Sequence, residues 1–171
     1  ITTQLYILMK IIASLSLALL FLTPFAQEAP LSVFENIVGS TWVSEGTQLG
    51  GHQGKTVKEI KWGLDGKIVQ VTTYTTDPNT LEFGLRNEGV RIFNAESEQL
   101  EFYEFDKKGG VSKGVIKIDG ENIHYEYPYG DLVLRDSWIY QSKDEYIYRV
   151  CAVKSDTCDQ IFHEGTFKRK Q

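Results

Sequence analysis

The chain has 171 residues and a formal net charge of −5. Its composition is uneven, because the first 26 residues carry one charge, Lys10, while all 15 glycines follow them. The remainder is rich in β-branched and aromatic residues and poor in alanine and leucine, which excludes a helical bundle, a coiled coil, a doubly wound nucleotide-binding fold and a disordered chain. The acidic balance excludes the basic surface typical of nucleic-acid binding.

The first segment has the pattern of a secretory signal peptide. Lys10 precedes an uncharged apolar run over residues 11–22, and polar residues begin soon after this run. A membrane-spanning helix needs about 20 apolar residues, which the run does not reach. We therefore expect residues 1–26 to be a signal peptide, with residues 1–8 lying upstream of a start at Met9.

Residues 27–171 have the composition of one domain, since no proline- or serine-rich linker divides them. We expect this domain to be exported, to the periplasm or outside the cell, and to have no membrane span of its own. The composition does not indicate an oligomeric state.

The domain is predicted to begin with a short helix. Ser32 and Glu35 have the spacing of a capping box, and Phe34 and Val38 fall on one helical face. Gly39 can adopt the left-handed conformation that ends a helix. After this glycine the hydrophobic pattern changes from helical to alternating.

Residues 56–75 have the clearest hairpin pattern. Asp65-Gly66 is a two-residue turn sequence that matches the twist of the flanking strands. A one-residue slip would mix apolar and polar side chains on each face, so the register is well determined. It pairs Trp62 with Val69, Ile60 with Val71, Lys61 with Gln70 and Glu59 with Thr72.

Similar alternating segments occur along the rest of the domain. They are Thr41–Glu45, Leu81–Leu85, Val90–Phe93, Leu100–Phe105, Val111–Ile118, Ile123–Tyr127, Leu132–Tyr140, Glu145–Val153 and Asp159–Lys168. Short connections make each strand antiparallel to its predecessor, and closing the sheet removes exposed edges. The sequence therefore predicts an all-β fold, an antiparallel up-and-down β-barrel of about 8–11 strands, with room for side chains or one small ligand.

The order of a short helix, the segment Asn36–Trp42 and an unbroken meander ending in Gly165–Arg169 resembles the lipocalin and fatty-acid-binding (calycin) superfamily. The chain is most similar to secreted bacterial lipocalin-like barrels of unassigned role. In that superfamily a tryptophan near the first strand packs across the closed end of the barrel, beside a basic residue from the last strand. The resemblance implies these structural roles for Trp42 and Arg169, although two residues separate Gly39 from Trp42 where the family motif has one.

The chain is also similar to the haem-binding nitrobindin barrels, whose iron-binding histidine lies on the final strand. His163 has the corresponding place, but its spacing to Phe167 differs by one residue, which turns a strand side chain to the other face. His52, His124 and His163 lie on separate segments without metal-ligand spacing. We therefore expect no metal and no cofactor, with haem at His163 as the less favoured alternative.

The two cysteines are predicted to form a disulfide. Cys151 and Cys158 are symmetric about Lys154-Ser155, so a two-residue turn there would place them opposite each other. Oxidation agrees with an exported protein, and the bond would fasten the last hairpin.

Aromatic residues recur at positions that alternation directs inward. A filled core and an aromatic-lined pocket are both compatible with this pattern. Arg135 and Arg149 are candidate anchors for a carboxylate, because a guanidinium group offers two parallel donors. The side to which Arg149 points depends on the length of the turn at Lys143-Asp144. The predicted ligand-binding residues are Trp62, Phe83, Phe102, Tyr125, Arg135, Trp138, Tyr148 and Arg149.

A nucleophile–base pattern and a phosphate-binding glycine loop cannot be recognised in the sequence. Asp136 shares a strand face with Trp138 and is a candidate interior acid, but a solvated residue near the rim is the favoured interpretation. We therefore predict a non-catalytic exported protein that binds a small, largely apolar or amphipathic ligand inside the barrel. An isomerase or hydrolase with an interior acidic residue, and a ligand-free envelope interaction domain, are the alternatives.

Overall fold

The computed structural model describes residues 30–49 and 52–170, with the side chains of 47–49 and 52–53 left aside. The expected signal peptide lies outside the described residues. A short 3-10 helix, η1 (Ser32–Phe34), precedes ten strands. The strands are β1 (Ser40–Leu49), β2 (His52–Gly63), β3 (Ile68–Thr76), β4 (Phe83–Asn94), β5 (Gln99–Asp106), β6 (Val111–Asp119), β7 (Asn122–Tyr129), β8 (Leu132–Ser142), β9 (Glu145–Lys154) and β10 (Thr157–Arg169).

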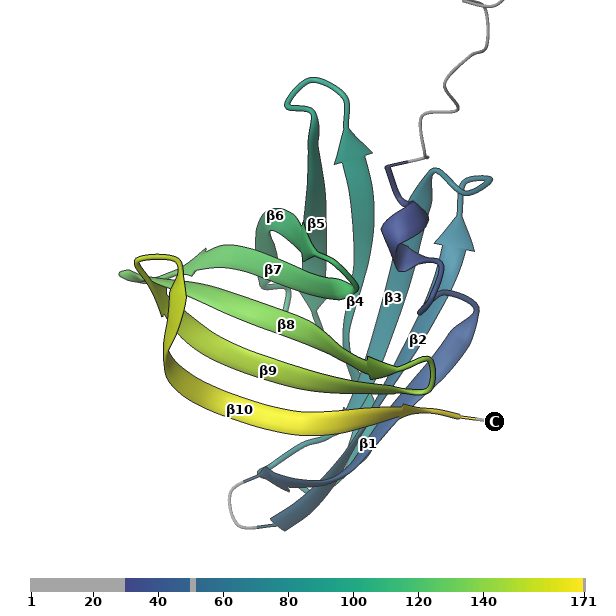
Figure 1. Ribbon diagram of the computed structural model, residues 1–171. Coiled ribbons are helices and arrows are strands. Elements are labelled where there is room, and N and C mark those ends of the chain that lie inside the picture. The colour runs from purple at the N-terminus through teal and green to yellow at the C-terminus, as the bar shows by residue number, and fades with distance from the viewer. Residues whose placement is uncertain (1–29, 50–51, 171) are drawn as a thin grey trace, which may run out of the picture.

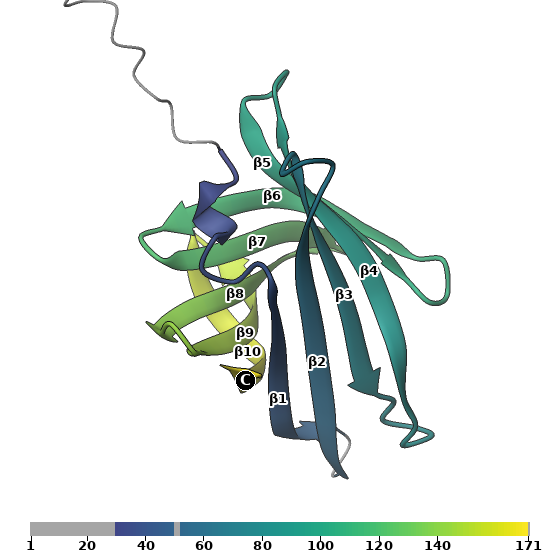
Figure 2. The ribbon, with the colours of Figure 1, turned by 90° about the vertical axis from the view of Figure 1, so that its right-hand side faces the viewer.

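The strands form one closed antiparallel barrel in which each strand pairs with its predecessor and β10 pairs with β1. The predicted all-β up-and-down barrel is therefore confirmed. Figure 1 shows β7 to β10 crossing the direction of β2 and β3, and Figure 2 shows the same arrangement from the side. We call the end that holds η1 and the β2–β3 turn the closed end, and the end that holds the β3–β4 and β5–β6 turns the open end.

The N-terminal turn is shorter than predicted. Only Ser32–Phe34 is helical, the helix is of the 3-10 type, and no side chain caps it. The capping-box prediction is thus wrong, because burial of Phe34 holds the turn in place rather than a polar cap. Gly39 has the expected left-handed conformation, with φ of 74°, and its N–H donates to the Ile60 carbonyl at 2.9 Å.

The first hairpin has the predicted register, with Trp62 opposite Val69 and Ile60 opposite Val71. Asp65 and Gly66 both have positive φ, as a type I′ turn requires. The buried Ile60 and Val69 identify the inner face of these strands.

The prediction of separate strands over Leu81–Leu85 and Val90–Phe93 is wrong, because residues 83–85 and 90–93 belong to one strand, β4, which Leu81 precedes. The intervening Asn87 pairs with Thr73 of β3 instead of forming a turn. The register shifts by one residue between Thr73 and Tyr74, so β4 contains a β-bulge within a continuous strand.

A disulfide joins Cys151 in β9 to Cys158 in β10, with Cα atoms 5.7 Å apart. The predicted pairing of the cysteines is confirmed, but the predicted turn is displaced. The turn lies at Ser155-Asp156, where both residues have positive φ, rather than at Lys154-Ser155. The cysteines are consequently offset along the hairpin instead of directly opposite.

The closed end is filled by aromatic side chains around the fully buried Trp42. Its indole N–H donates to the Ile37 carbonyl at 3.0 Å, and the Arg169 guanidinium lies 4.7 Å from the indole centroid. Arg169 also donates to the Asn36 carbonyl and forms an ion pair with Asp144 at 3.2 Å. One side chain thus connects the N-terminal turn, β1, the β8–β9 turn and β10.

No helix within residues 30–49 and 52–170 is long and apolar enough to cross a membrane.

Candidate functional site

The interior becomes polar on the open-end side of the aromatic side chains that fill the closed end. Four strands each direct one charged side chain inward, namely Lys58 from β2, Arg91 from β4, Glu104 from β5 and Asp136 from β8. We call these four residues the polar cluster. Lys58 and Arg91 are buried, with 7% and 4% of their surface exposed.

Arg91 and Glu104 form an ion pair within the cluster. Arg91 Nη2 donates to Glu104 Oε1 at 2.5 Å, and the two side chains are 5% and 20% exposed. Burial opposes both charges, but each group stabilises the other, so the pKa of Arg91 is raised and the pKa of Glu104 is lowered. Both groups are therefore charged at neutral pH.

Two donor atoms of Arg91 have no hydrogen-bond partner of ordinary geometry, and the guanidinium also interacts with the side chain of Tyr125, whose ring centroid lies 4.9 Å away. These donor atoms, Nε and Nη1, are buried and have no such partner among the described residues. A buried donor without an acceptor costs about 1–3 kcal/mol, so native structures seldom leave one unpaired. Gly89 provides the space for this group, since a Cβ at that position would lie 2.8 Å from Arg91 Nη1.

Lys58 lies over an aromatic ring next to the ion pair. Its ammonium is 4.9 Å from the centroid of Tyr148. Burial lowers the pKa of Lys58, while Glu104 and Asp136 act in the opposite direction. Lys58 and Arg91 together give the cluster two cations to balance two carboxylates.

Asp136 is an interior acid rather than a solvated rim residue, so the favoured interpretation from the sequence is wrong. It accepts hydrogen bonds from the hydroxyls of Tyr148 at 2.5 Å and Tyr127 at 3.1 Å. Burial raises the pKa of Asp136, and the hydrogen bond from Tyr148 and the charge of Lys58 only partly offset this effect. Burial and the neighbouring Asp136 also raise the pKa values of both tyrosines.

The cluster surrounds a small polar cavity of about 40 Å³. Its lining is formed by Lys58, Arg91, Phe102, Glu104, Ser112, Tyr125, Tyr127, Asp136, Trp138 and Tyr148. Ligand pockets for whole small molecules usually measure roughly 300–1,000 Å³, whereas one water in the liquid occupies about 30 Å³. The cavity therefore matches the size of one polar group, such as a carboxylate, and not of a complete apolar ligand.

Four of the eight predicted ligand-binding residues lie at this cavity: Phe102, Tyr125, Trp138 and Tyr148. The rings of Phe102 and Tyr125 meet edge to face with centroids 5.3 Å apart. Strand alternation thus predicted the aromatic part of the lining.

Trp62 and Phe83 do not lie at this cavity. Trp62 is opposite Val69 near the closed end and is 41% exposed. Phe83 is 51% exposed and stacks on Tyr74, which alternates with the buried Thr73 and therefore lies on the outer face. The bulge beside Tyr74 explains this error, because it inverts the alternation between the two ends of β4.

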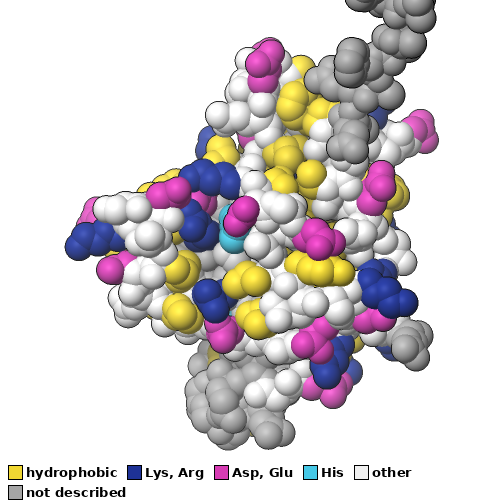
Figure 3. Space-filling model, in the orientation of Figure 1, with side chains coloured by type: hydrophobic (Ala, Val, Ile, Leu, Met, Phe, Trp, Pro, Cys, Tyr) yellow, Lys and Arg dark blue, Asp and Glu magenta, His cyan; other side chains and the backbone are white. Residues whose placement is uncertain are grey.

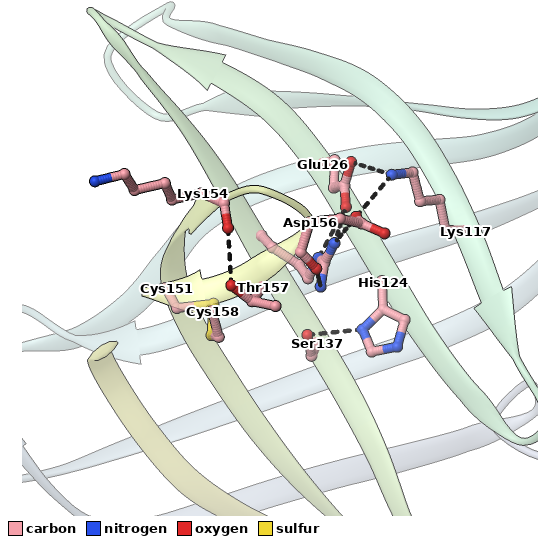
Figure 4. Close-up of polar contacts among 10 residues, drawn as sticks. Lys117, His124, Glu126, Ser137, Cys151, Lys154, Asp156, Thr157 and Cys158 are labelled. Atoms are coloured by element: carbon pink, nitrogen blue, oxygen red, sulfur yellow. Dashed lines mark hydrogen bonds and ion pairs between the residues drawn. A yellow bond between two sulfur atoms is a disulfide. The ribbon is translucent and has the colours of Figure 1, made fainter. Parts of the chain in front are cut away.

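Arg135 and Arg149 point away from the barrel interior, so neither can anchor an interior ligand in this arrangement. Arg135 pairs with Glu126 at 2.5 Å and Asp156 at 2.6 Å. Figure 4 shows Lys117 reaching the same two carboxylates beside the disulfide. Arg149 pairs with Glu164 at 2.7 Å.

The direction of Arg149 follows from an irregularity in the β8–β9 hairpin. Ser142 pairs with Glu145 across a two-residue turn, but the register shifts at Gln141. Tyr148 rather than Arg149 therefore lies opposite Trp138. Turn length alone could not predict this result, because a bulge of one residue has the same effect on facing as a longer turn.

The predicted site residues did not include Lys58, Arg91 or Glu104, although the sequence contains a signal for them. Each lies two residues from an apolar side chain that alternation places on the inner face, such as Ile60 for Lys58 and Phe102 for Glu104. An isolated charge on an otherwise apolar strand face is the pattern that would have identified them.

His163 is half-buried on β10, and its ring centre lies 6.1 Å from that of Tyr148. Burial lowers the pKa of His163, so it is neutral at pH 7. Within the described part of the chain, no group of three or more histidine, cysteine or acidic side chains is arranged to hold a metal ion.

A larger groove of about 660 Å³ lies outside the barrel wall, between β1, β2 and the end of β10. Its lining includes Val43, Val57 and a Lys55–Glu45 ion pair at 3.2 Å. We regard the smaller interior cavity as the candidate site, because none of the residues that line the groove is buried.

The fold and the interior charges define a closed ten-stranded β-barrel that is consistent with a calycin-like fold and compatible with ligand binding. No family model and no curated protein matches the chain.

Proposed function

We propose that this barrel is a binding protein for a small amphipathic anion, whose anionic head lies in the cavity of the polar cluster. The head accepts hydrogen bonds from Arg91 and forms an ion pair with Lys58. The proposed carboxylate anchors, Arg91 and Lys58, are not the residues that were predicted from the sequence. The interaction is of the predicted kind, between a cationic side chain and a carboxylate.

The observation that supports the proposal most directly is the pair of Arg91 donors without a hydrogen-bond partner of ordinary geometry. Nε and Nη1 are buried and lack such a partner among the described residues, and they border a cavity of about 40 Å³. A carboxylate satisfies such donors with charge-assisted hydrogen bonds. Four ionisable groups inside a barrel, two of them buried, are also an inefficient way to stabilise it, since apolar replacements are often equally stable.

The ligand's apolar part would extend toward the open end. On that side of Asp136, Leu134 pairs with Ala152, and both are 8% exposed. These side chains give an alkyl group an apolar surface next to the cluster.

Export is part of the proposal. The Cys151–Cys158 disulfide supports an oxidising compartment, and the signal-peptide pattern of residues 1–26 supports the same location.

The test is calorimetric titration with laurate and with dodecanol, which has the same chain length but no charge. Arg91→Gln should weaken laurate binding about 10- to 100-fold, as expected for hydrogen bonds to a charged group, and should leave dodecanol binding unchanged. Arg149→Gln removes an arginine on the outer face of the barrel and is the matched control. Lys58→Gln serves as a second variant if Arg91→Gln does not fold, and equal laurate affinity in the folded variants and the wild type would contradict the proposal.

Acid–base catalysis is the second candidate function, and the position of Asp136 favours it. A buried carboxyl with a raised pKa that borders a cavity is a common feature of active sites. Hydrolysis of p-nitrophenyl butyrate tests the hydrolase form of this candidate. Turnover should be lost in Asp136→Asn and retained in Asp131→Asn, and equal rates in both variants would exclude Asp136 as the catalytic group.

A further inference from the structure

The junction of β1 with β10, which closes the barrel, is its shortest strand pairing. It pairs only Trp42 with Arg169 and Val43 with Lys168 within the described residues. Each of the other strand pairs in the barrel is joined over five residue pairs or more. Figure 1 shows β1 and β10 close together near the marked C-terminus and diverging from there. The barrel wall is therefore incomplete on the open-end side of this junction.

Two main-chain hydrogen bonds show which residues of β10 face β1. The N–H of Arg169 donates to the Asp144 carbonyl at 2.9 Å, on the β9 side. The N–H of Lys170 donates to the Thr41 carbonyl at 2.8 Å, on the β1 side. Main-chain groups of an antiparallel strand point alternately toward its two neighbours. The main chain of Thr166, like that of Lys170, therefore points toward β1.

Glu45 is the residue of β1 that would face Thr166 if the pairing continued. Glu45 lies two residues after Val43, and Thr166 lies two residues before Lys168, so both belong to the set that exchanges main-chain hydrogen bonds. The register in the described part of the chain does not include this pair. A β-bulge follows directly at Gly46, where φ is 79°. Because a bulge bends its strand, it explains why the two edges separate at this point.

The separated edges border a cavity of about 340 Å³. Its lining consists of Ser44, Glu45 and Gly46 from β1 and residues 162–166 from β10. Glu45 and Thr166 also line the groove of about 660 Å³ on the outer wall, so the cavity and the groove adjoin. We call the cavity of about 340 Å³ the seam cleft.

The main-chain edges of the seam cleft fit an extended polypeptide. An open strand edge presents N–H and C=O groups at a spacing that another strand matches, and an alkyl chain cannot satisfy them. Figure 3 shows basic and acidic side chains together on the surface around the C-terminal end of β10, so this region is not an apolar surface.

The edges also lack the residues that usually prevent strand addition. Lysine and proline protect many exposed edges, and neither occurs in residues 44–46 or 162–166. The Glu45 side chain pairs with Lys55 at 3.2 Å, and the Glu164 side chain pairs with Arg149 at 2.7 Å. Both carboxylates thus contact neighbouring strands of the wall, which leaves the main chain of the cleft accessible.

We propose that the seam cleft binds an extended polypeptide segment, which pairs with β1 on one side and with β10 on the other. The bound segment completes the barrel wall between the two strands. This site is separate from the polar cluster, and the inference does not rest on the function proposed for the interior.

The test is fluorescence anisotropy of a short fluorescein-labelled peptide of alternating threonine and valine, titrated with the purified protein. The wild type should bind this peptide. Thr166→Pro removes the N–H that faces β1 and should weaken binding about tenfold or more, as expected for the loss of a main-chain hydrogen bond that leaves its partner unpaired. Thr166→Ala is the matched control, because it changes the side chain and keeps the N–H, and its affinity should equal that of the wild type.

Two N-methylated peptides give an independent test if Thr166→Pro does not fold. One lacks the N–H groups of its odd residues and the other those of its even residues, so each loses its donors to one of the two edges. Both should fail to bind the wild type. Failure of only one peptide would show pairing with a single edge and would overturn the inference, as would equal affinity of Thr166→Pro and the wild type. Absence of binding to the wild type would also overturn it, and sedimentation of the wild type as a dimer would then identify the cleft as a contact between copies.

Discussion

The Tyr148 hydroxyl donates a 2.5 Å hydrogen bond to Oδ2 of Asp136 in the middle of the barrel. The same tyrosine ring lies beneath the Lys58 ammonium at 4.9 Å. Tyr148 therefore contacts an acidic and a basic member of the polar cluster at once, and this connection makes the interior electrostatics testable.

Replacing Asp136 should change how stability depends on pH. Burial raises the pKa of Asp136 above its ordinary 3.8, so its contribution to stability is full below pH 3.8 and is lost as pH rises through the folded-state value. The stability of Asp136→Asn does not fall with pH in this way, because the asparagine side chain does not titrate. The free energy of unfolding of the variant minus that of the wild type should therefore increase as pH rises above 3.8, and urea unfolding at several pH values measures it. A difference that stays constant or decreases would contradict the raised pKa.

Glu104 should have the opposite dependence. Arg91 and Lys58 outweigh the effect of burial and lower the pKa of Glu104 from 4.5, so its stabilising contribution is present above pH 4.5 and is lost as pH falls through the lower value. Glu104→Gln leaves the Arg91 charge unpaired and should reduce stability by about 3–5 kcal/mol at neutral pH. Replacing Arg91 by Met as well should recover part of this loss, and a double-mutant cycle in urea would reveal it. Strict additivity of the two single changes would show that the groups do not interact.

The Arg169 guanidinium should be essential to the closed end. Arg169→Lys keeps the charge over Trp42 but cannot reproduce contacts to Asn36, Lys143 and Asp144. We expect a loss of about 2 kcal/mol, because a lysine replaces a planar fork by a single ammonium. Thermal unfolding followed by tryptophan fluorescence measures the change. A variant as stable as the wild type would show that the cation–π contact alone is sufficient.

Gly114 should not tolerate a side chain, for a reason that is separate from backbone conformation. A Cβ at Gly114 would lie 1.9 Å from the Glu126 carbonyl oxygen, whereas a Cβ at Gly84 meets no atom within 4 Å. Gly114→Ala should therefore lower stability by about 1–3 kcal/mol, and Gly84→Ala, the control, should have little effect. Chemical denaturation of both variants measures these changes in stability. Equal stability of the two variants would mean that β6 and β7 separate easily.

The sequence predicted most of the architecture because antiparallel hairpins are specified locally. Alternation and turn chemistry predict the register of β2 and β3 and the up-and-down order of about 8–11 strands. The errors arise where one residue is inserted into a strand. Bulges beside Tyr74 and at Gln141 inverted the expected facing of Phe83 and Arg149, and such insertions leave no strong mark in composition.

The polar cluster was only partly predictable for a different reason. Its aromatic lining follows from alternation, but its charges come one each from four different strands, β2, β4, β5 and β8. Arg91 and Glu104 are brought together by the pairing of β4 with β5. The mutual stabilisation that allows them to be buried depends on this contact, and single-strand patterns do not contain it.

The central claim is that the anionic head of a ligand lies between Lys58 and Arg91. The most direct measurement is the NMR signal of carboxyl-¹³C laurate bound to the protein, followed over the pH range in which free laurate titrates. Two adjacent cations hold a carboxylate in its charged form, so the bound signal should stay constant in the wild type and should titrate in Arg91→Gln. A bound signal that titrates like free laurate in the wild type would contradict the account.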